Sequence, residues 1–283
     1  MKLASYVHEG VTGYGAVVGD GIVDLSRRIG AAYPDVKSLL AKAGLAEARK
    51  AIQGQRLDFA LAQARLLPPV TNPGKILCIG LNYEGHLKET KREKTEDPAV
   101  FVRFPDGHVG HGQPMVRPRE SVKYDYEGEI AVVIGKPGRR IAEKDAWDHV
   151  GGYSCYNDGS VRDWQLATTQ WTAGKNFPSS GAFGPWIVTA DEIAPGATLT
   201  LITRLNGAEM PRGTSNMLIH SIPRLLAHIS AWTALAAGDV ISTGTPGGVG
   251  MRRDPPVFMK PGDVVEVEVD RVGVLRNPIV QEE

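Results

Sequence analysis

Residues 124–135 read YDYEGEIAVVIG, in which a polar stretch passes into a continuous apolar run that ends at glycine. This pattern predicts one extended segment from about residue 124 to about residue 134. Because successive side chains of a strand point to opposite faces, Glu127 and Glu129 are expected on the same face. The segment therefore predicts two carboxylates that converge beside an apolar strand.

Short β-like runs dominate the sequence on either side of this segment. They read KILCIGL at 75–81, LTLITRLNG at 199–207, DVISTGT at 239–245 and DVVEVEV at 263–269. Helical spacing of apolar residues occurs at 86–93, 143–150 and 221–235. The major part of the chain is thus predicted to be mainly β, with a few helices (an α+β fold).

The amino-terminal part is predicted to form a small α+β unit. Short strands flank a Gly19-Asp20-Gly21 turn, and Asp35 is positioned to cap a single helix over residues 36–52. Pro68 and Pro69 then interrupt the pattern. We expect a small domain at 1–68 and a major domain at 69–283.

Composition excludes several classes of protein. The 283 residues carry 32 basic and 32 acidic side chains, so a nucleic-acid partner is not expected. No apolar run is long enough to span a bilayer, and the protein is predicted to be cytoplasmic with no membrane partner. Cys78 and Cys155 are expected to be free, buried thiols.

A third acid is predicted to join Glu127 and Glu129. Asp158 follows the β-like GGYSCY in a polar loop, where its carboxylate can reach over the end of a sheet. Like charges held together call for a cation, and the lack of a His or Cys cluster favours Mg²⁺ or Mn²⁺, with Ca²⁺ possible, over zinc. The alternative is a solvent-facing edge strand with no metal.

Two further segments carry candidate catalytic groups. On a helix, His86 and Glu89 share one face, where the carboxylate can orient the imidazole as a general base. Lys175, expected in a loop with glycine on its flank, is placed to bind an anionic substrate. The alternatives are an incidental surface pair and a solvated loop lysine. His108 and His111 are expected to lie in a solvated loop.

The glycine-rich run STGTPGGVG follows a predicted strand and offers hydroxyls and backbone amides to an oxyanion. It lacks the order of a P-loop, and the chain has neither a dinucleotide fingerprint nor a serine-hydrolase elbow. Nucleotide binding and serine hydrolysis therefore have little support.

Taken in order, several blocks resemble the fumarylacetoacetate hydrolase family. The resemblance covers roughly residues 75–278 and rests on GLNYEGHLKE, DYEGEIAVVIGK, GGYSCYNDGSVRDWQ, GKNFPSSGAFGP, GDVISTGTPGGVG and KPGDVVEVEV. It implies a mixed β-sandwich roll, a homodimer, and Mg²⁺ or Mn²⁺ held by residues that match Glu127, Glu129 and Asp158.

The resemblance also implies roles for other residues. His86 and Glu89 match a dyad on a mobile lid, Gln165 and Lys175 match catalytic residues at the substrate, and Thr245 and Arg162 are candidate substrate-binding residues. Two positions depart from the family pattern. Arg103 precedes Phe104 in FVRFP, and Arg212 follows the Asn-Gly turn where many relatives have glutamine.

The expected substrate is a small oxo-acid. Water activation by the His-Glu dyad puts hydrolysis of a carbon-carbon bond in an acylpyruvate or fumarylacetoacetate-like β-diketo acid first. Decarboxylation of oxaloacetate-like acids, or isomerisation or tautomerisation of unsaturated oxo-diacids, comes second. A dimer that binds metal only for stability is the third hypothesis.

Overall fold

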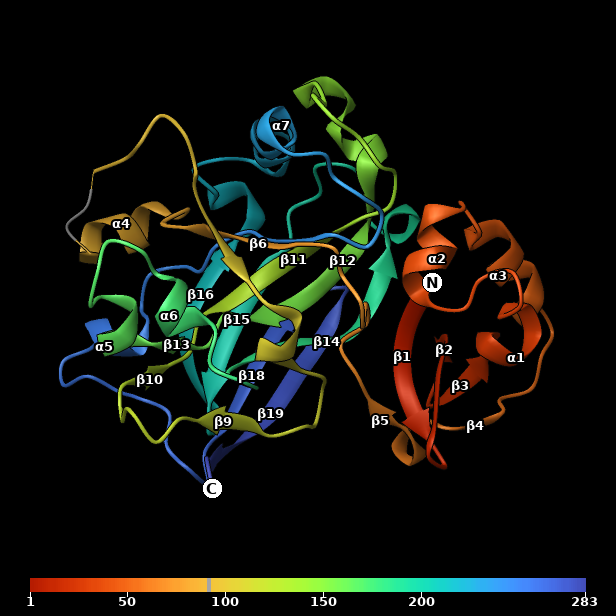
Figure 1. The fold of residues 1–283 in the computed structure, drawn as a ribbon, viewed down its shortest axis with the longest axis horizontal. Helices are drawn as coiled ribbons and strands as arrows, with labels where there is room; N and C mark the ends of the chain where they lie inside the picture. The colour runs from red at the N-terminus through yellow and green to blue at the C-terminus, as the bar shows by residue number, and fades with distance from the viewer. Residues whose placement is uncertain (91–92) are drawn as a thin grey trace.

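A computed structural model of the chain describes residues 1–90 and 93–283. Most of its strands belong to two sheets that lie against each other in the major part of the molecule (Figure 1). The larger sheet has twelve strands. In spatial order they are β4 (Phe59–Ala60), β3 (Gly21–Asp24), β2 (Val11–Val18), β1 (Lys2–His8), β14 (Gly181–Thr189), β12 (Val150–Asn157), β11 (Gly128–Ile134), β17 (Val240–Ser242), β6 (Ile76–Gly80) and β7 (Ala99–Arg103), with β5 (Arg65–Leu66) beside β1 and β8 (His108–Val109) beside β14.

The smaller sheet has five strands, and a two-stranded ribbon lies near the site described below. The five strands are β16 (Ala208–Thr214), β15 (Thr200–Leu205), β18 (Val264–Val269), β19 (Gly273–Gln281) and β9 (Met115–Arg117), and the ribbon is β10 (Tyr124–Asp125) with β13 (Ser160–Val161). Parallel and antiparallel pairs both occur. The predicted mainly β, α+β fold with mixed sheets is confirmed.

Helices are short and lie around the sheets. They are α1 (Leu25–Ile29), α2 (Val36–Ala41), α3 (Leu45–Ile52), α4 (Glu84–Thr90), α5 (Arg162–Gln165), α6 (Thr172–Lys175) and α7 (Ile222–Trp232), and the segment at 143–150 forms a 3₁₀ helix, Glu143–His149. Of the helix expected at 86–93, Lys91 and Arg92 lie outside the described residues. Within the described ranges, no helix is long and apolar enough to cross a membrane.

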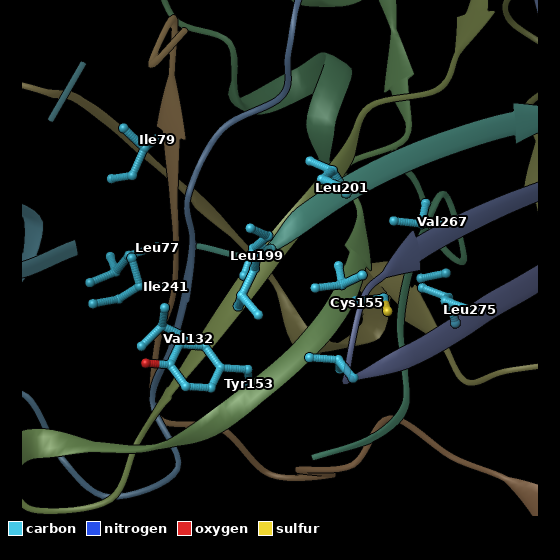
Figure 2. Packing of buried hydrophobic residues seen from close by; sticks show 14 of the residues in the cluster. Leu77, Ile79, Val132, Tyr153, Cys155, Leu199, Leu201, Ile241, Val267 and Leu275 are labelled. Atoms are coloured by element: carbon cyan, nitrogen blue, oxygen red, sulfur yellow. The ribbon is translucent and has the colours of Figure 1, made fainter. Parts of the chain in front are cut away.

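The main hydrophobic core fills the space between the two sheets. Figure 2 shows Tyr153 and Cys155 of the larger sheet in one buried cluster with Leu201, Val267 and Leu275 of the smaller one, and Cys155 lies beside Val267 and Leu275. All five side chains are buried. Removing this much apolar surface from water is the chief force that holds the two sheets together.

Gly128 has a specific part in this packing. A Cβ atom at this position would lie 2.1 Å from Thr203 Oγ1 and 3.2 Å from the methyl groups of Val267. Strand β11 therefore approaches the smaller sheet too closely for any side chain at residue 128. Glu127 and Glu129, on either side, are left to point away from the core.

The segment 124–134 is not one strand, as the sequence predicted. Tyr124 and Asp125 pair with β13, whereas residues from Gly128 onward pair with β12. Glu127 lies in the break between the two pairings. The break arises because the chain leaves the ribbon and joins the large sheet at this point.

The amino-terminal unit packs at one end of the molecule (Figure 1). The predicted hairpin is confirmed, with Gly19 at a φ of 56° in the turn between β2 and β3. Strand β1 pairs with β14, so the large sheet runs from this unit into the rest of the chain. The domain boundary at residue 68 stays a prediction.

The prediction of a single helix over residues 36–52 is wrong. Asp35 does cap its start, accepting a hydrogen bond from the Ser38 N–H at 2.6 Å, but the chain turns at Ala43, whose φ is 53°. Gly44 then packs so closely on Tyr33 that a Cβ atom would lie 2.7 Å from its ring. Tertiary packing thus divides the segment into α2 and α3.

Candidate active site

Three carboxylates converge at one end of the paired strands β11 and β12. Glu129 is on β11, Asp158 directly follows β12, and the Asp158 N–H donates to the Glu127 carbonyl at 2.8 Å. Each acid offers an oxygen within 4.8 Å of the others, and the residues are 4%, 2% and 0% exposed for Glu127, Glu129 and Asp158. The alternative of a solvent-facing edge is therefore wrong.

Two buried cations contact these acids. Lys175 Nζ lies 2.5 Å from Glu127 Oε2 and 2.6 Å from Asp158 Oδ2, and Arg162 Nη2 lies 2.7 Å from Glu127 Oε1. Lys175 is the last residue of α6 and is only 1% exposed, so the alternative of a solvated loop lysine is also wrong. Both cations are held by the acids they neutralise.

Arg103 and Asp125 extend the ionic network, and neither was among the predicted site residues. Arg103 Nη1 donates to Asp158 Oδ1 at 2.6 Å, and its Nη2 donates to Ser180 Oγ. Asp125 Oδ2 accepts from Arg162 Nε at 2.8 Å. The sequence held two signals, since Arg103 departs from the family pattern and Asp125 is in the deciding segment.

The groups around Glu127 and Glu129 shift the pKa values of these two carboxyls in opposite directions. Burial disfavours the charged form of Glu127, but the charges of Arg162 and Lys175 outweigh it and lower the pKa of Glu127 below its ordinary value. Burial, together with the charges of Asp158 and Glu127, raises the pKa of Glu129 well above its ordinary value. A cation beside Glu129 would offset this repulsion.

The donor set fits a hard divalent cation. Glu129 Oε2 already accepts hydrogen bonds from Ser242 Oγ at 2.6 Å and from the Gly244 N–H at 2.8 Å, which fixes the carboxylate and leaves its second oxygen free to bind a metal. Oxygen ligands of this kind suit Mg²⁺ and Mn²⁺. The buried charged groups of the site are four carboxylates and three cations: Asp125, Glu127, Glu129, Asp158, Arg103, Arg162 and Lys175. When all four carboxylates are ionised they outnumber the cations by one, and a bound metal ion would balance that charge.

The predicted His-Glu pair is formed on α4. His86 Nδ1 lies 2.6 Å from Glu89 Oε1, and Glu89 Oε2 accepts from the Gly248 N–H at 2.8 Å. The carboxylate therefore links the helix to the glycine-rich loop and fixes the imidazole. With Nδ1 protonated and bound to Glu89, His86 Nε2 is left as the acceptor.

One cavity brings these groups together. Its volume is about 60 Å³, and its walls contain every predicted site residue except Glu89: His86, Glu127, Glu129, Asp158, Arg162, Gln165, Lys175 and Thr245. Gln165 Oε1 accepts from Arg162 Nη1 at 2.9 Å. Thr245 is 3% exposed, and its hydroxyl has no hydrogen-bond partner among the described residues.

The expectation of a solvated loop for His108 is wrong. His108 is buried, its Nε2 bonds to the Tyr156 hydroxyl, and burial with the charge of Arg103 lowers the pKa of His108 well below its ordinary value. His111 is half-buried and accepts from the Arg276 N–H. Neither residue lines the cavity. Cys78 and Cys155 are free and buried, as predicted.

Residues 75–280 match the model of the fumarylacetoacetate (FAA) hydrolase C-terminal domain. The chain belongs to the fumarylacetoacetate hydrolase family. The resemblance found in the sequence is thus confirmed over the same region. The amino-terminal residues 1–74 lie outside the match.

Relatives within this family carry more than one activity. The mitochondrial oxaloacetate tautomerase of Xenopus laevis is 40% identical over 243 residues, which cover 85% of this chain and 76% of that protein. Two of the similar solved structures illustrate this, and each match covers 100% of both chains. One is the maleylpyruvate hydrolase of Sphingobium sp. SYK-6 with manganese(II) and pyruvate (TM-score 0.84, 31% identity), and the other is the 5-carboxymethyl-2-hydroxymuconate delta-isomerase of Mycobacterium smegmatis (TM-score 0.79, 30% identity).

Proposed function

We propose that this protein is a divalent-metal enzyme that interconverts the keto and enol forms of a small 2-oxo acid. The observation that carries the choice of reaction is its similarity to proteins named oxaloacetate tautomerases, which exceeds its similarity to the maleylpyruvate hydrolase. The second hypothesis from the sequence, tautomerisation, therefore moves ahead of hydrolysis. Mg²⁺ or Mn²⁺, bound by Glu127, Glu129 and Asp158, would supply Lewis-acid polarisation of the ketone.

The residues of the cavity fit this reaction. Ketonisation and enolisation exchange one C–H bond for one O–H bond and need no second reactant. In enolisation His86, oriented by Glu89, would take the proton from the carbon next to the ketone, and the ketone oxygen would gain a proton from solvent; in ketonisation both protons move in the opposite direction. Lys175 is unsuited as a base, because its ammonium lies 2.5 Å from Glu127 Oε2 and 2.6 Å from Asp158 Oδ2. Its ammonium group would instead stabilise negative charge on the bound substrate.

The size of the cavity also favours a small substrate. Its volume of about 60 Å³ is far below the roughly 300–1,000 Å³ of pockets that take drug-sized ligands. Aliphatic and aromatic side chains, including Ile79, Phe101 and Trp171, form much of the rest of the wall.

Hydrolysis of acylpyruvates is the second candidate, because the same His86 can activate a water. The test is to strip the protein of metal, add Mg²⁺ or Mn²⁺, and follow the enol form of oxaloacetate by its ultraviolet absorbance. In parallel, pyruvate and carbon dioxide release are measured with acylpyruvates and oxaloacetate. A Glu129→Gln variant in the same metal buffer corrects for tautomerisation in solution.

We expect metal-dependent tautomerisation by the protein and no pyruvate from acylpyruvates. Metal-dependent pyruvate release without tautomerisation would establish the hydrolase instead. Carbon dioxide release from oxaloacetate alone would establish a decarboxylase. Metal binding without turnover on any of these substrates would favour the third hypothesis, a metal-stabilised dimer.

A further inference from the structure

Arg252 differs from the other cations of the cavity wall. Arg162 and Lys175 are buried and form ion pairs with the carboxylates of the site. Arg252 also lines the cavity but is exposed, and its guanidinium forms no hydrogen bond or ion pair with any residue in the described ranges. Its charge is therefore available to a ligand.

The backbone that carries Arg252 is fixed. Arg252 ends the 3₁₀ helix Gly250–Arg252, whose first two N–H groups donate to the Asp125 carboxylate at 2.8 and 2.9 Å. The next residue, Arg253, donates from Nε to the Tyr126 hydroxyl at 3.1 Å. The turn is thus held to the ionic network of the site, and the Arg252 side chain extends from a fixed backbone.

Thr245 supplies a second, independent sign of a ligand in this cavity. Its side chain is 97% buried, yet its hydroxyl has no partner among the residues that the structure describes. Buried hydroxyls are nearly always hydrogen-bonded, so an unpaired one in a cavity wall indicates a group that a ligand provides. The cavity therefore offers an unpaired hydroxyl within it and an unpaired cation on its exposed side.

Charge complementarity defines that ligand. With a divalent cation bound and all four buried carboxylates ionised, the buried groups and the cation together carry one positive charge. Arg252 adds a second positive charge at the cavity wall. A 2-oxo dicarboxylate carries two negative charges, one at each end, and matches this distribution.

We propose that Arg252 binds the distal carboxylate of a 2-oxo dicarboxylate, and so selects diacids over monoacids. The assignment rests on the proposed function for the placement of the 2-oxo end at the metal. A guanidinium pairs with a carboxylate through two parallel hydrogen bonds, which gives geometric selectivity as well as charge. Arg252 is thus a specificity-determining residue of the site.

The test uses inert ligands that differ only at the distal end. Malate and 2-hydroxybutyrate share a 2-hydroxy-acid head, but malate ends in a carboxylate and 2-hydroxybutyrate in a methyl group. Their dissociation constants are measured by calorimetry on the Mn²⁺-loaded full chain, for the wild type, Arg252→Met and Arg252→Lys. Arg56→Met, an exposed arginine of the amino-terminal unit, is the matched control.

We expect the wild type and Arg56→Met to bind malate at least about tenfold more tightly than 2-hydroxybutyrate, since charge-assisted pairs are the strong ones. Arg252→Met should remove most of this preference by weakening malate alone, and Arg252→Lys should keep part of it. An unchanged preference in Arg252→Met, or no preference in the wild type, would overturn the assignment.

Failure of the proposed reaction gives a different result. Preference for malate that depends on Arg252, in a protein without tautomerase turnover, would contradict the reaction and leave the diacid site in place. Tautomerase turnover with a preference for malate that does not depend on Arg252 would support the proposed reaction and contradict the role of Arg252.

Discussion

Arg103 Nη1 donates a hydrogen bond to Asp158 Oδ1 at 2.6 Å, between two side chains that are both fully buried. The same guanidinium donates to Gly159 O and to Ser180 Oγ, so three hydrogen bonds fix its plane. One oxygen of Asp158 is thereby engaged, and the other is directed into the site. Arg103 positions a metal ligand without being one.

This arrangement predicts that Arg103→Lys weakens metal binding. Lysine keeps the charge but cannot reproduce the planar contacts, and loss of an outer-shell partner typically costs about 10–100-fold in metal affinity. The measurement is Mn²⁺ titration by calorimetry, with urea unfolding to check that the fold survives. Arg204→Lys, whose ion pair with Glu268 lies on the smaller sheet, is the control and should bind Mn²⁺ normally. Equal Mn²⁺ affinity in Arg103→Lys and wild type would contradict the positioning role.

The two glutamates should respond in opposite ways to removal of their charge. Glu129→Gln removes a repelled carboxylate, so the metal-free variant should be as stable as the wild type or more stable. Glu127→Gln takes the partner from Arg162 and Lys175, and breaking a buried pair costs about 3–5 kcal/mol. Thermal unfolding of both metal-free variants measures this difference.

Bound Mn²⁺ should raise the free energy of unfolding of the wild type but not that of Glu129→Gln. At a Mn²⁺ concentration of about one hundred times Kd, binding to the folded state adds about 2.7 kcal/mol. We expect this gain to be lost in Glu129→Gln. If that variant gained as much stability from Mn²⁺ as the wild type, Glu129 would not be a ligand.

The raised pKa of Glu129 also predicts the pH dependence of the metal-free protein. Between the ordinary pKa of 4.5 and the raised folded value, the folded state binds one proton that the unfolded state has lost. Stability therefore falls as pH rises through this window. Urea unfolding of wild type and Glu129→Gln over about pH 5–8 should show a wild-type curve that declines relative to the variant. A constant difference between the two would contradict the shift in pKa.

The sequence predicted the fold where local pattern agrees with tertiary packing. The hairpin around Gly19 and the helix that begins after Ser221 are set by short-range signals, and both are present. The helix over 36–52 was wrong because its break depends on contact between Gly44 and Tyr33. Periodicity contains no information about that contact.

In the site, too, local sequence patterns predicted some residues but not the contacts between distant segments. Glu127 and Glu129 were paired from their spacing, and Asp158 from its place after a strand. Arg103 reaches Asp158 across 55 residues of sequence, and no local pattern indicates that contact. Burial of Lys175 depends likewise on Glu127, 48 residues away. Long-range ion pairs are therefore the part of the site that sequence reasoning missed.

His86 and Glu89 provide the last prediction, because they separate proton transfer from metal binding. His86→Ala removes the base and should lower kcat about 10²–10⁴-fold, with Mn²⁺ affinity unchanged. Glu89→Gln keeps a hydrogen-bond acceptor for His86 Nδ1 but loses the charge. Its kcat should therefore fall less than that of His86→Ala. Tautomerase rates and Mn²⁺ titrations on both variants test this, and His149→Ala, far along the chain and bonded to the Lys136 carbonyl, serves as control. Added imidazole should restore part of the activity of His86→Ala, because a small base can enter the space that the side chain leaves. Full activity in His86→Ala would mean that another group of the cavity moves the proton.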